Sequence, residues 1–166
     1  MPDDDLILAG AVGLYRKVDL STWGDPSVLV PFDSDLKSLG FEFLGDLIRS
    51  ALAHGILRVY IHPAEHARVI LLLGVKNGVQ NVFGVFFDSQ FGDGAMATTT
   101  SSSAVKDIPT EGIHRRVCAW KGVYDLHQQH QAHLKELQTR HGAPVATWDT
   151  LLSVAESIDS FSARMN

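Results

Sequence analysis

The chain has 166 residues, of which 45% are hydrophobic and 20% are charged, and this composition is typical of one globular domain. The net charge is −5, and the 14 lysines and arginines are scattered along the chain, which excludes the basic footprint that duplex nucleic acid requires. We therefore expect no nucleic-acid partner.

The compartment is predicted from the cysteine content and the N-terminal residues. Cys118 is the only cysteine, so no intramolecular disulfide can form and nothing points to an oxidising compartment. The apolar run Leu6–Leu14 follows acidic rather than basic residues and is too short to span a bilayer core of about 30 Å. We expect neither a signal peptide nor a membrane span, and a cytoplasmic location by default.

Two helices are expected before the first strand. Acidic residues near the N-terminus, with Arg16 and Lys17 further on, suit the two ends of a helix over residues 4–18. A second, short helix is expected to begin at Asp33 and to close at Gly40, where a left-handed C-cap is wanted.

The most apolar part of the chain predicts adjacent antiparallel strands. Leu57, Val59 and Ile61 alternate with polar or aromatic residues, which predicts a strand with one buried face. Residues 69–73 are apolar at every position, so this strand is expected to be central and covered on both faces.

The later strands are marked by their turns. Asn77-Gly78 is typical of a type I′ hairpin turn and makes residues 79–87 the partner strand. Residues 95–100 are small or β-branched and predict a further strand, which suits either an edge of the sheet or a face crossed by a helix. Residues 113–120 alternate again and predict a sixth strand.

Two helices are expected at the C-terminus. Tyr124–His141 carries an apolar face and is followed by Gly142, so it predicts a long helix with a normal stop. Thr147 is a suitable N-cap for a second helix. Its apolar stripe consists of Trp148, Leu151, Leu152, Ala155 and Ile158.

These elements predict an α+β fold, an antiparallel meander sheet of five or six strands with N-terminal and C-terminal helices packed on it. Residues 1–166 are expected to form one domain. It divides into an N-terminal helical segment (1–40), the antiparallel sheet (41–120) and a C-terminal helix pair (121–166).

Eight histidines are the one unusual feature of the composition. Residues 62–66 match the H-x-x-E-H pattern of some zinc peptidases, but that mechanism needs both histidines on one helix face. Because the segment follows a strand and contains Pro63, we interpret it as a hairpin turn.

The long C-terminal helix carries His127, His130 and His133, which spread over an arc of about 120° and cannot all reach one ion. His130 and His133 could bind zinc together with a sheet residue such as His114. The alternative interpretation is helix packing with hydrogen-bonded ring nitrogens.

Two further groups of side chains are candidates for a binding site. An apolar ligand pocket between the sheet and the C-terminal helices would be lined by Tyr60, Phe83, Trp120 and Trp148. Asp88, Asp93 and Glu111 could converge, although each also suits a structural role in a turn.

Several motifs resemble a loosely defined group of uncharacterised bacterial α+β proteins, a domain of unknown function. They are the segment 41–46 (Phe-Glu-Phe-Leu-Gly-Asp), Phe87 followed by Asp93-Gly94 and Thr98-Thr99, and His130 on a later helix. The resemblance covers residues 36–135. It implies the fold and carries no activity.

The sequence predicts a non-enzymatic cytoplasmic binding or protein-interaction module, with a partner protein or a second copy bound at the edge strand 95–100. No cofactor and no catalytic residue is assigned. The alternatives are a metal-dependent enzyme that uses zinc at His130, His133 and His114, and a domain that binds a small apolar ligand.

Overall fold

The computed structural model describes residues 5–20, 26–50, 55–76, 79–101 and 110–165. Its strands are β1 (Leu6–Ala9), β2 (Leu14–Val18), β3 (Glu42–Arg49), β4 (Ile56–His62), β5 (Ala67–Lys76), β6 (Val79–Gln90), β7 (Met96–Thr100) and β8 (Ile113–Val117). Its helices are α1 (Val30–Ser38), α2 (Val123–His141) and α3 (Leu151–Met165), with short 3-10 turns at Pro26–Leu29 and Pro63–Glu65.

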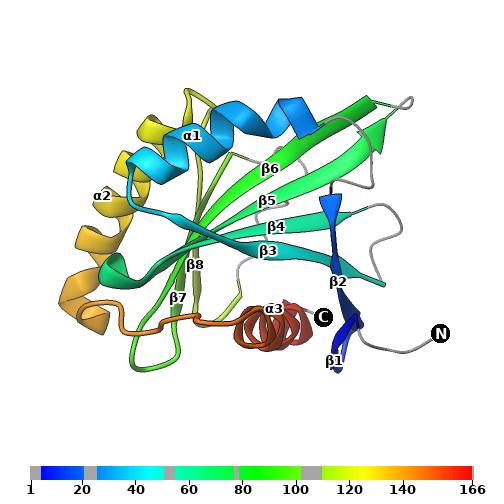
Figure 1. The fold of residues 1–166 in the computed structure, drawn as a ribbon. Helices are drawn as coiled ribbons and strands as arrows, with labels where there is room; N and C mark the ends of the chain where they lie inside the picture. Colours follow the sequence, from blue (N-terminus) through cyan, green and yellow to red (C-terminus); the bar gives the residue numbers. More distant parts are fainter. Residues whose placement is uncertain (1–4, 21–25, 51–54, 77–78, 102–109, 166) are drawn as a thin grey trace.

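The strands form one sheet in which the spatial order follows the chain order from β1 to β8 (Figure 1). Every neighbouring pair is antiparallel except β7 and β8, which run parallel. The predicted α+β fold with a mostly antiparallel sheet is confirmed. The described part of the chain contains eight strands, more than the five or six predicted.

Helices cover both faces of the sheet (Figure 1). One face packs under α1 and α2, through a cluster that includes Val69, Leu71 and Phe87. The other face packs under α3, through a cluster that includes Ile70. Alternate residues of β5 therefore enter different cores, which confirms the prediction that this strand is covered on both faces. The turn Asn77-Gly78 lies outside the described residues, but β5 and β6 pair antiparallel on either side of it.

The helix predicted over residues 4–18 is wrong, because the chain forms the hairpin of β1 and β2 there. Asp159 of α3 accepts hydrogen bonds from the backbone N–H groups of Ala11, at 2.7 Å, and Val12, at 2.9 Å. A Cβ atom at Gly10 would lie 2.4 Å from the same carboxylate. The hairpin is thus fixed by a residue almost 150 positions away, a contact that local helix signals do not contain.

Two predicted local features are confirmed. Gly40 follows α1 with φ +93°, and its N–H group bonds to the carbonyl of Lys37, as expected for a left-handed helix end. The histidine-containing segment after β4 is a turn, in which His62 Nδ1 accepts a hydrogen bond from the backbone N–H of Glu65. This geometry is not the helix that a zinc peptidase needs.

For residues 95–100 the prediction of an edge strand is wrong, and the alternative of a face crossed by a helix is confirmed, since Ala95 and Ala97 pack with Leu134 and Leu137 of α2. β7 lies between β6 and β8, and Thr99 and Thr100 are fully buried. β8 pairs parallel with β7, with Ile113 beside Met96 and Val117 beside Thr100. The edges of the described sheet are β1 and β8.

The two C-terminal helices are confirmed with different limits. α2 spans Val123–His141, and α3 begins at Leu151 rather than directly after Thr147. The hydroxyl that caps α3 belongs to Thr150, whose Oγ1 accepts a hydrogen bond from the N–H of Ser153. No described helix is long and apolar enough to cross a membrane.

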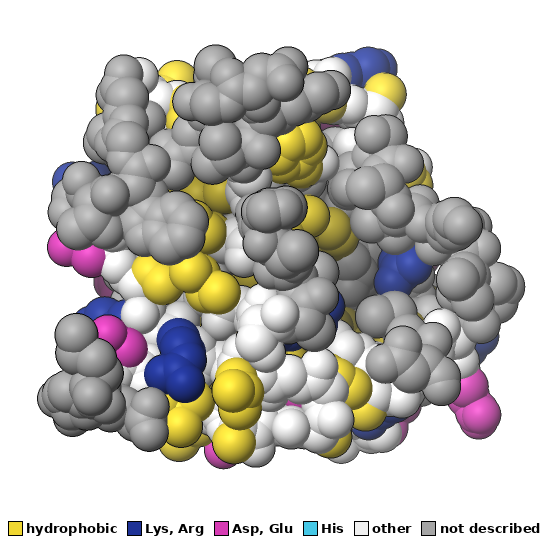
Figure 2. Space-filling view, turned by 90° about the vertical axis from the view of Figure 1, so that its right-hand side faces the viewer, with side chains coloured by type: hydrophobic (Ala, Val, Ile, Leu, Met, Phe, Trp, Pro, Cys, Tyr) yellow, Lys and Arg dark blue, Asp and Glu magenta, His cyan; other side chains and the backbone are white. Residues whose placement is uncertain are grey.

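Figure 2 shows the face on the right-hand side of Figure 1, on which several hydrophobic side chains of described residues reach the surface. No described histidine is in view on this face. The described histidines are therefore buried or lie on other faces of the molecule.

We expect Gly40→Ala to destabilise the protein more than Gly122→Ala does. Both glycines have positive φ, +93° and +100°, a backbone conformation that costs other residues on the order of 1–3 kcal/mol. At Gly40 the added Cβ would also lie 2.7 Å from His62 Nε2, whereas nothing lies within 4 Å at Gly122. Urea unfolding should show an extra loss of about 1 kcal/mol or more for Gly40→Ala. Equal losses would contradict the packing of His62 against this turn.

Candidate functional site

The predicted metal ligands His130 and His133 belong to a buried hydrogen-bond network between α2 and the sheet. His130 is fully buried, with Nε2 2.9 Å from Ser89 Oγ and Nδ1 2.8 Å from Thr99 Oγ1. The same hydroxyl lies 3.1 Å from His133 Nδ1. Both ring nitrogens of His130 are therefore used by hydroxyl groups, and neither points at an open position for a metal ion.

Burial keeps this histidine pair neutral. Desolvation, together with the neighbouring His133 and His127, lowers the pKa of His130 to about 3. Desolvation also lowers the pKa of His133 to about 4, with Arg116 acting in the same direction. The network is thus a satisfied polar core, which is the packing alternative that the sequence left open.

The four aromatic residues predicted to line one ligand pocket are not brought together. Tyr60 is buried on the α1 and α2 side of the sheet, where its hydroxyl bonds to Asp33, whereas Trp148 is buried on the α3 side. Phe83 is 43% exposed, and Trp120 is 47% exposed. The structure thus distributes these side chains over both faces and the surface.

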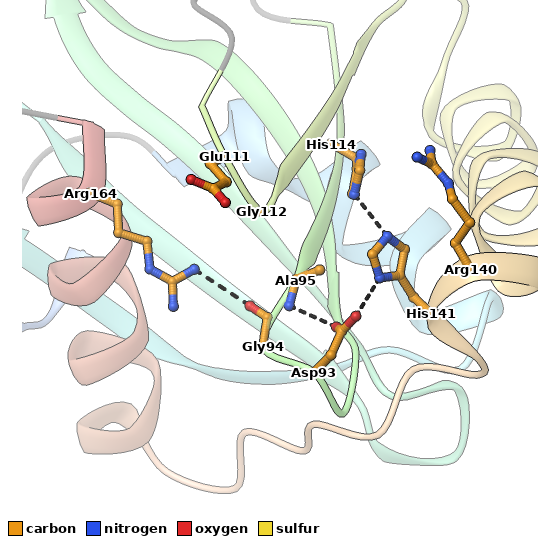
Figure 3. A pocket seen from close by; sticks show the side chains of 9 residues that line it. All are labelled: Asp93, Gly94, Ala95, Glu111, Gly112, His114, Arg140, His141 and Arg164. Carbon is orange, nitrogen blue, oxygen red and sulfur yellow. Dashed lines mark hydrogen bonds and ion pairs between the residues drawn. The ribbon is translucent and has the colours of Figure 1, made fainter.

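A different set of titratable side chains does converge (Figure 3). His141 Nδ1 donates a 2.5 Å hydrogen bond to Asp93 Oδ2, and His141 Nε2 lies 3.0 Å from His114 Nε2. The result is a continuous chain from a carboxylate through one imidazole to a second imidazole. His114, one of the predicted metal ligands, is paired with His141 rather than with His130 and His133.

Three parts of the fold position this chain. Asp93 lies in the turn between β6 and β7, where its Oδ1 accepts a hydrogen bond from the N–H of Ala95. His141 is the last residue of α2 and stacks on the buried ring of Phe91, with ring centroids 5.2 Å apart. His114 lies on β8 and reaches His141 because β8 runs parallel beside β7.

The hydrogen bonds set the charge of each group. The bond from His141, together with that from the backbone of Ala95, lowers the pKa of Asp93 and keeps it ionised. Burial, with His141 and Arg140 nearby, lowers the pKa of His114 and favours its neutral form. When the His141 ring carries only the Nδ1 proton that Asp93 holds, its Nε2 atom has a lone pair.

These residues line a pocket of about 370 Å³ that is open to solvent (Figure 3). The turn before β7, the segment before β8 and the C-terminal ends of α2 and α3 form its walls. The lining residues are Asp93, Gly94, Ala95, Glu111, Gly112, His114, Arg140, His141 and Arg164. It therefore combines two carboxylates, two imidazoles and two guanidinium groups.

Sequence reasoning identified part of this set. Asp93 and Glu111, for which convergence was one of two interpretations, line one pocket, whereas Asp88 pairs with the buried Arg68 at 3.1 Å. His141 and the two arginines were not singled out. The position of His141 directly before Gly142 marks the end of a helix, but no local signal tells which strand that end faces.

A second hollow, of about 440 Å³, lies over the middle of α2. Gln131, Lys135 and Gln138 contribute from the helix, and Glu65 and Pro144 contribute from the segments beside it. This hollow contains neither an imidazole nor a guanidinium group, so the first pocket is the better candidate for specific chemistry.

Comparison of the chain with protein-family models, with curated proteins and with solved structures finds no match. The resemblance of residues 36–135 to uncharacterised bacterial proteins therefore stays a prediction. The function has to be argued from the pocket itself.

The neutral state of His130 and His133 predicts a loss of stability in acid. Below about pH 6.5 the unfolded chain protonates these histidines, whereas the folded chain resists protonation down to about pH 4. The free energy of unfolding should fall as the pH falls through this window, by up to about 1.4 kcal/mol per pH unit for each histidine. Urea unfolding at several pH values measures the slope.

His133→Gln tests this assignment, because glutamine can keep a hydrogen bond to Thr99 and does not titrate. The variant removes the titration of His133 and its lowering effect on the pKa of His130, so the difference between the two slopes reports both contributions of the His133 side chain. We expect a shallower acid slope in the variant. Identical slopes would show that His133 titrates in the folded protein as it does in the unfolded chain, which would contradict the lowered pKa.

Proposed function

We propose that the protein is a non-enzymatic binding domain for a small polar molecule with an anionic group, a carboxylate or a phosphate. The ligand would occupy the pocket of Arg140, Arg164, His114 and His141. A volume of about 370 Å³ lies within the range of small-molecule sites.

The proposal rests on two arginine side chains, Arg140 and Arg164, whose guanidinium groups have few hydrogen-bond partners among the described residues. Arg140 and Arg164 come from the last turns of α2 and α3 and reach the same pocket. The guanidinium groups make one hydrogen bond to the described residues, a 3.5 Å contact from Arg164 Nη1 to the carbonyl oxygen of Gly94. Guanidinium groups with donors to spare are suited to hold a carboxylate or a phosphate in two-point contact.

The remaining side chains of the pocket refine the ligand class. Asp93 is already bonded to His141, so its charge is partly compensated. Glu111 adds a carboxylate that can accept a hydrogen bond from a hydroxyl or amine on the ligand. A molecule that carries both an anionic group and a hydrogen-bond donor fits this arrangement best.

Binding is favoured over catalysis by the composition of the pocket lining. Asp93 and His141 form the carboxylate–imidazole pair that general-base catalysis uses. The described residues of the lining include no serine, threonine, cysteine or lysine that this pair could activate as a nucleophile. The pair is therefore assigned to recognition.

Isothermal titration with inorganic phosphate and with succinate at pH 7 tests the function. We expect Arg164→Gln and Arg140→Gln each to weaken the binding of the better probe about tenfold, because a hydrogen bond to a charged group is worth about 1.5–3 kcal/mol. Lys37→Gln is the charge-matched control, since Lys37 is an exposed residue of α1. It should bind like the unmodified protein.

The alternative to a binding role is a structural one, in which both arginines only stabilise the negative C-terminal ends of their helices. In that case neither probe binds, or the two arginine variants bind as well as Lys37→Gln does. Either result would contradict the proposed function.

Two further expectations remain proposals. Binding of a partner protein or of a second copy along a sheet edge would use β8 or β1, since β7 is interior. A cytoplasmic location is proposed because a chain with a single cysteine does not call for an oxidising compartment.

A further inference from the structure

His114 and His141 face each other through the same ring atom. Their Nε2 atoms lie 3.0 Å apart, and the two ring centroids lie 4.9 Å apart. At most one proton can sit between these two nitrogens, so at least one of them presents a lone pair toward the other. Two imidazole nitrogens converging in this way are a preformed pair of metal donors.

The spacing agrees with a shared metal ion. Two histidine nitrogens that bind one tetrahedral zinc ion at about 2.0–2.1 Å lie about 3.3 Å from each other. The observed separation is 3.0 Å, so an adjustment of a few tenths of an ångström would admit the ion. His141 lines the pocket from the last position of α2.

Asp93 supplies an independent observation. It accepts the Nδ1 proton of His141 at 2.5 Å, on the side of the ring opposite to His114. Histidines that bind metals almost always donate their other ring N–H to a carboxylate or carbonyl, which fixes the tautomer and raises the basicity of the ligating nitrogen. The orientation of His141 is thus the one that a metal ligand requires.

The charges around the pair also suit a cation with an anionic co-ligand. Asp93, Glu111 and the negative end of α2 favour a cation, whereas Arg140 and Arg164 oppose one unless an anion is present. Among the described residues no third histidine, cysteine, aspartate or glutamate completes a ligand group. The remaining positions of the ion would therefore be filled by water or by an exogenous ligand.

We propose that His114 and His141 bind one divalent transition-metal ion of the zinc type, with Asp93 holding His141 in its ligating tautomer. In a second step, which rests on the proposed function, the anionic group of the ligand occupies an open coordination position of this ion. The pair His130 and His133 takes no part.

Titration of the untagged, chelator-treated protein with Zn²⁺ or Co²⁺, in a buffer without small anions, tests the metal site. We expect one ion per chain, loss of binding in His114→Gln and in His141→Gln, and affinity lowered about 10- to 100-fold in Asp93→Asn. His127→Gln is the matched control, since His127 contacts Glu65 about four turns from His141 along α2 and should leave binding unchanged. Circular dichroism checks that each variant is folded.

Absence of stoichiometric binding by the folded protein would overturn the proposal. Equal affinity in His114→Gln, His141→Gln and His127→Gln would overturn it as well. Titration of succinate or phosphate into the metal-free protein, after the chelator has been removed by dialysis, separates the two proposals. Anion binding without metal binding leaves the proposed function and removes the metal site, and metal binding without anion binding does the reverse.

Discussion

The fold depends on the burial of both faces of its central strands. Val69 and Leu71 of β5 enter one core, while Ile70 between them enters the other. A strand that is apolar on every residue cannot leave either face to water without losing about 25 cal/mol for each Å² of apolar surface. α1 and α2 must therefore cover one side and α3 the other, and the ends of α2 and α3 are brought to the same end of the sheet (Figure 1).

The candidate site depends on the parallel pairing of β7 and β8 within a sheet whose other described pairs are antiparallel. Among the described strands, β8 alone runs parallel to its neighbour, and His114 on this strand lies beside the end of α2. α2 in turn is anchored by Leu134 and Leu137, which pack on Phe91 and Ala95 in the cluster around the turn before β7. The same packing that stabilises the turn thus fixes the positions of Asp93 and His141.

The sequence predicted the elements whose signals are local. The apolar strand β5 and the helix end at Gly40 follow from side-chain periodicity and backbone conformation. The helix predicted over residues 4–18 failed because Asp159, from the far end of the chain, binds the turn at Ala11 and Val12. The predicted metal site included His130, but both ring nitrogens of His130 contact the hydroxyl groups of Ser89 and Thr99. Helix periodicity can identify a buried histidine, but it does not tell which side chains its nitrogens contact.

The central claim is that Asp93 holds His141 with a bare Nε2 atom directed at His114. Long-range ¹H–¹⁵N NMR of the histidine side chains measures this directly, because protonated and unprotonated ring nitrogens resonate at different frequencies. The account predicts that His141 is protonated on Nδ1 and not on Nε2, and that the Nε2 resonances of His141 and His114 move together when Zn²⁺ is added. A proton found on Nε2 of His141 with Nδ1 bare, or zinc that leaves both resonances in place, would contradict it.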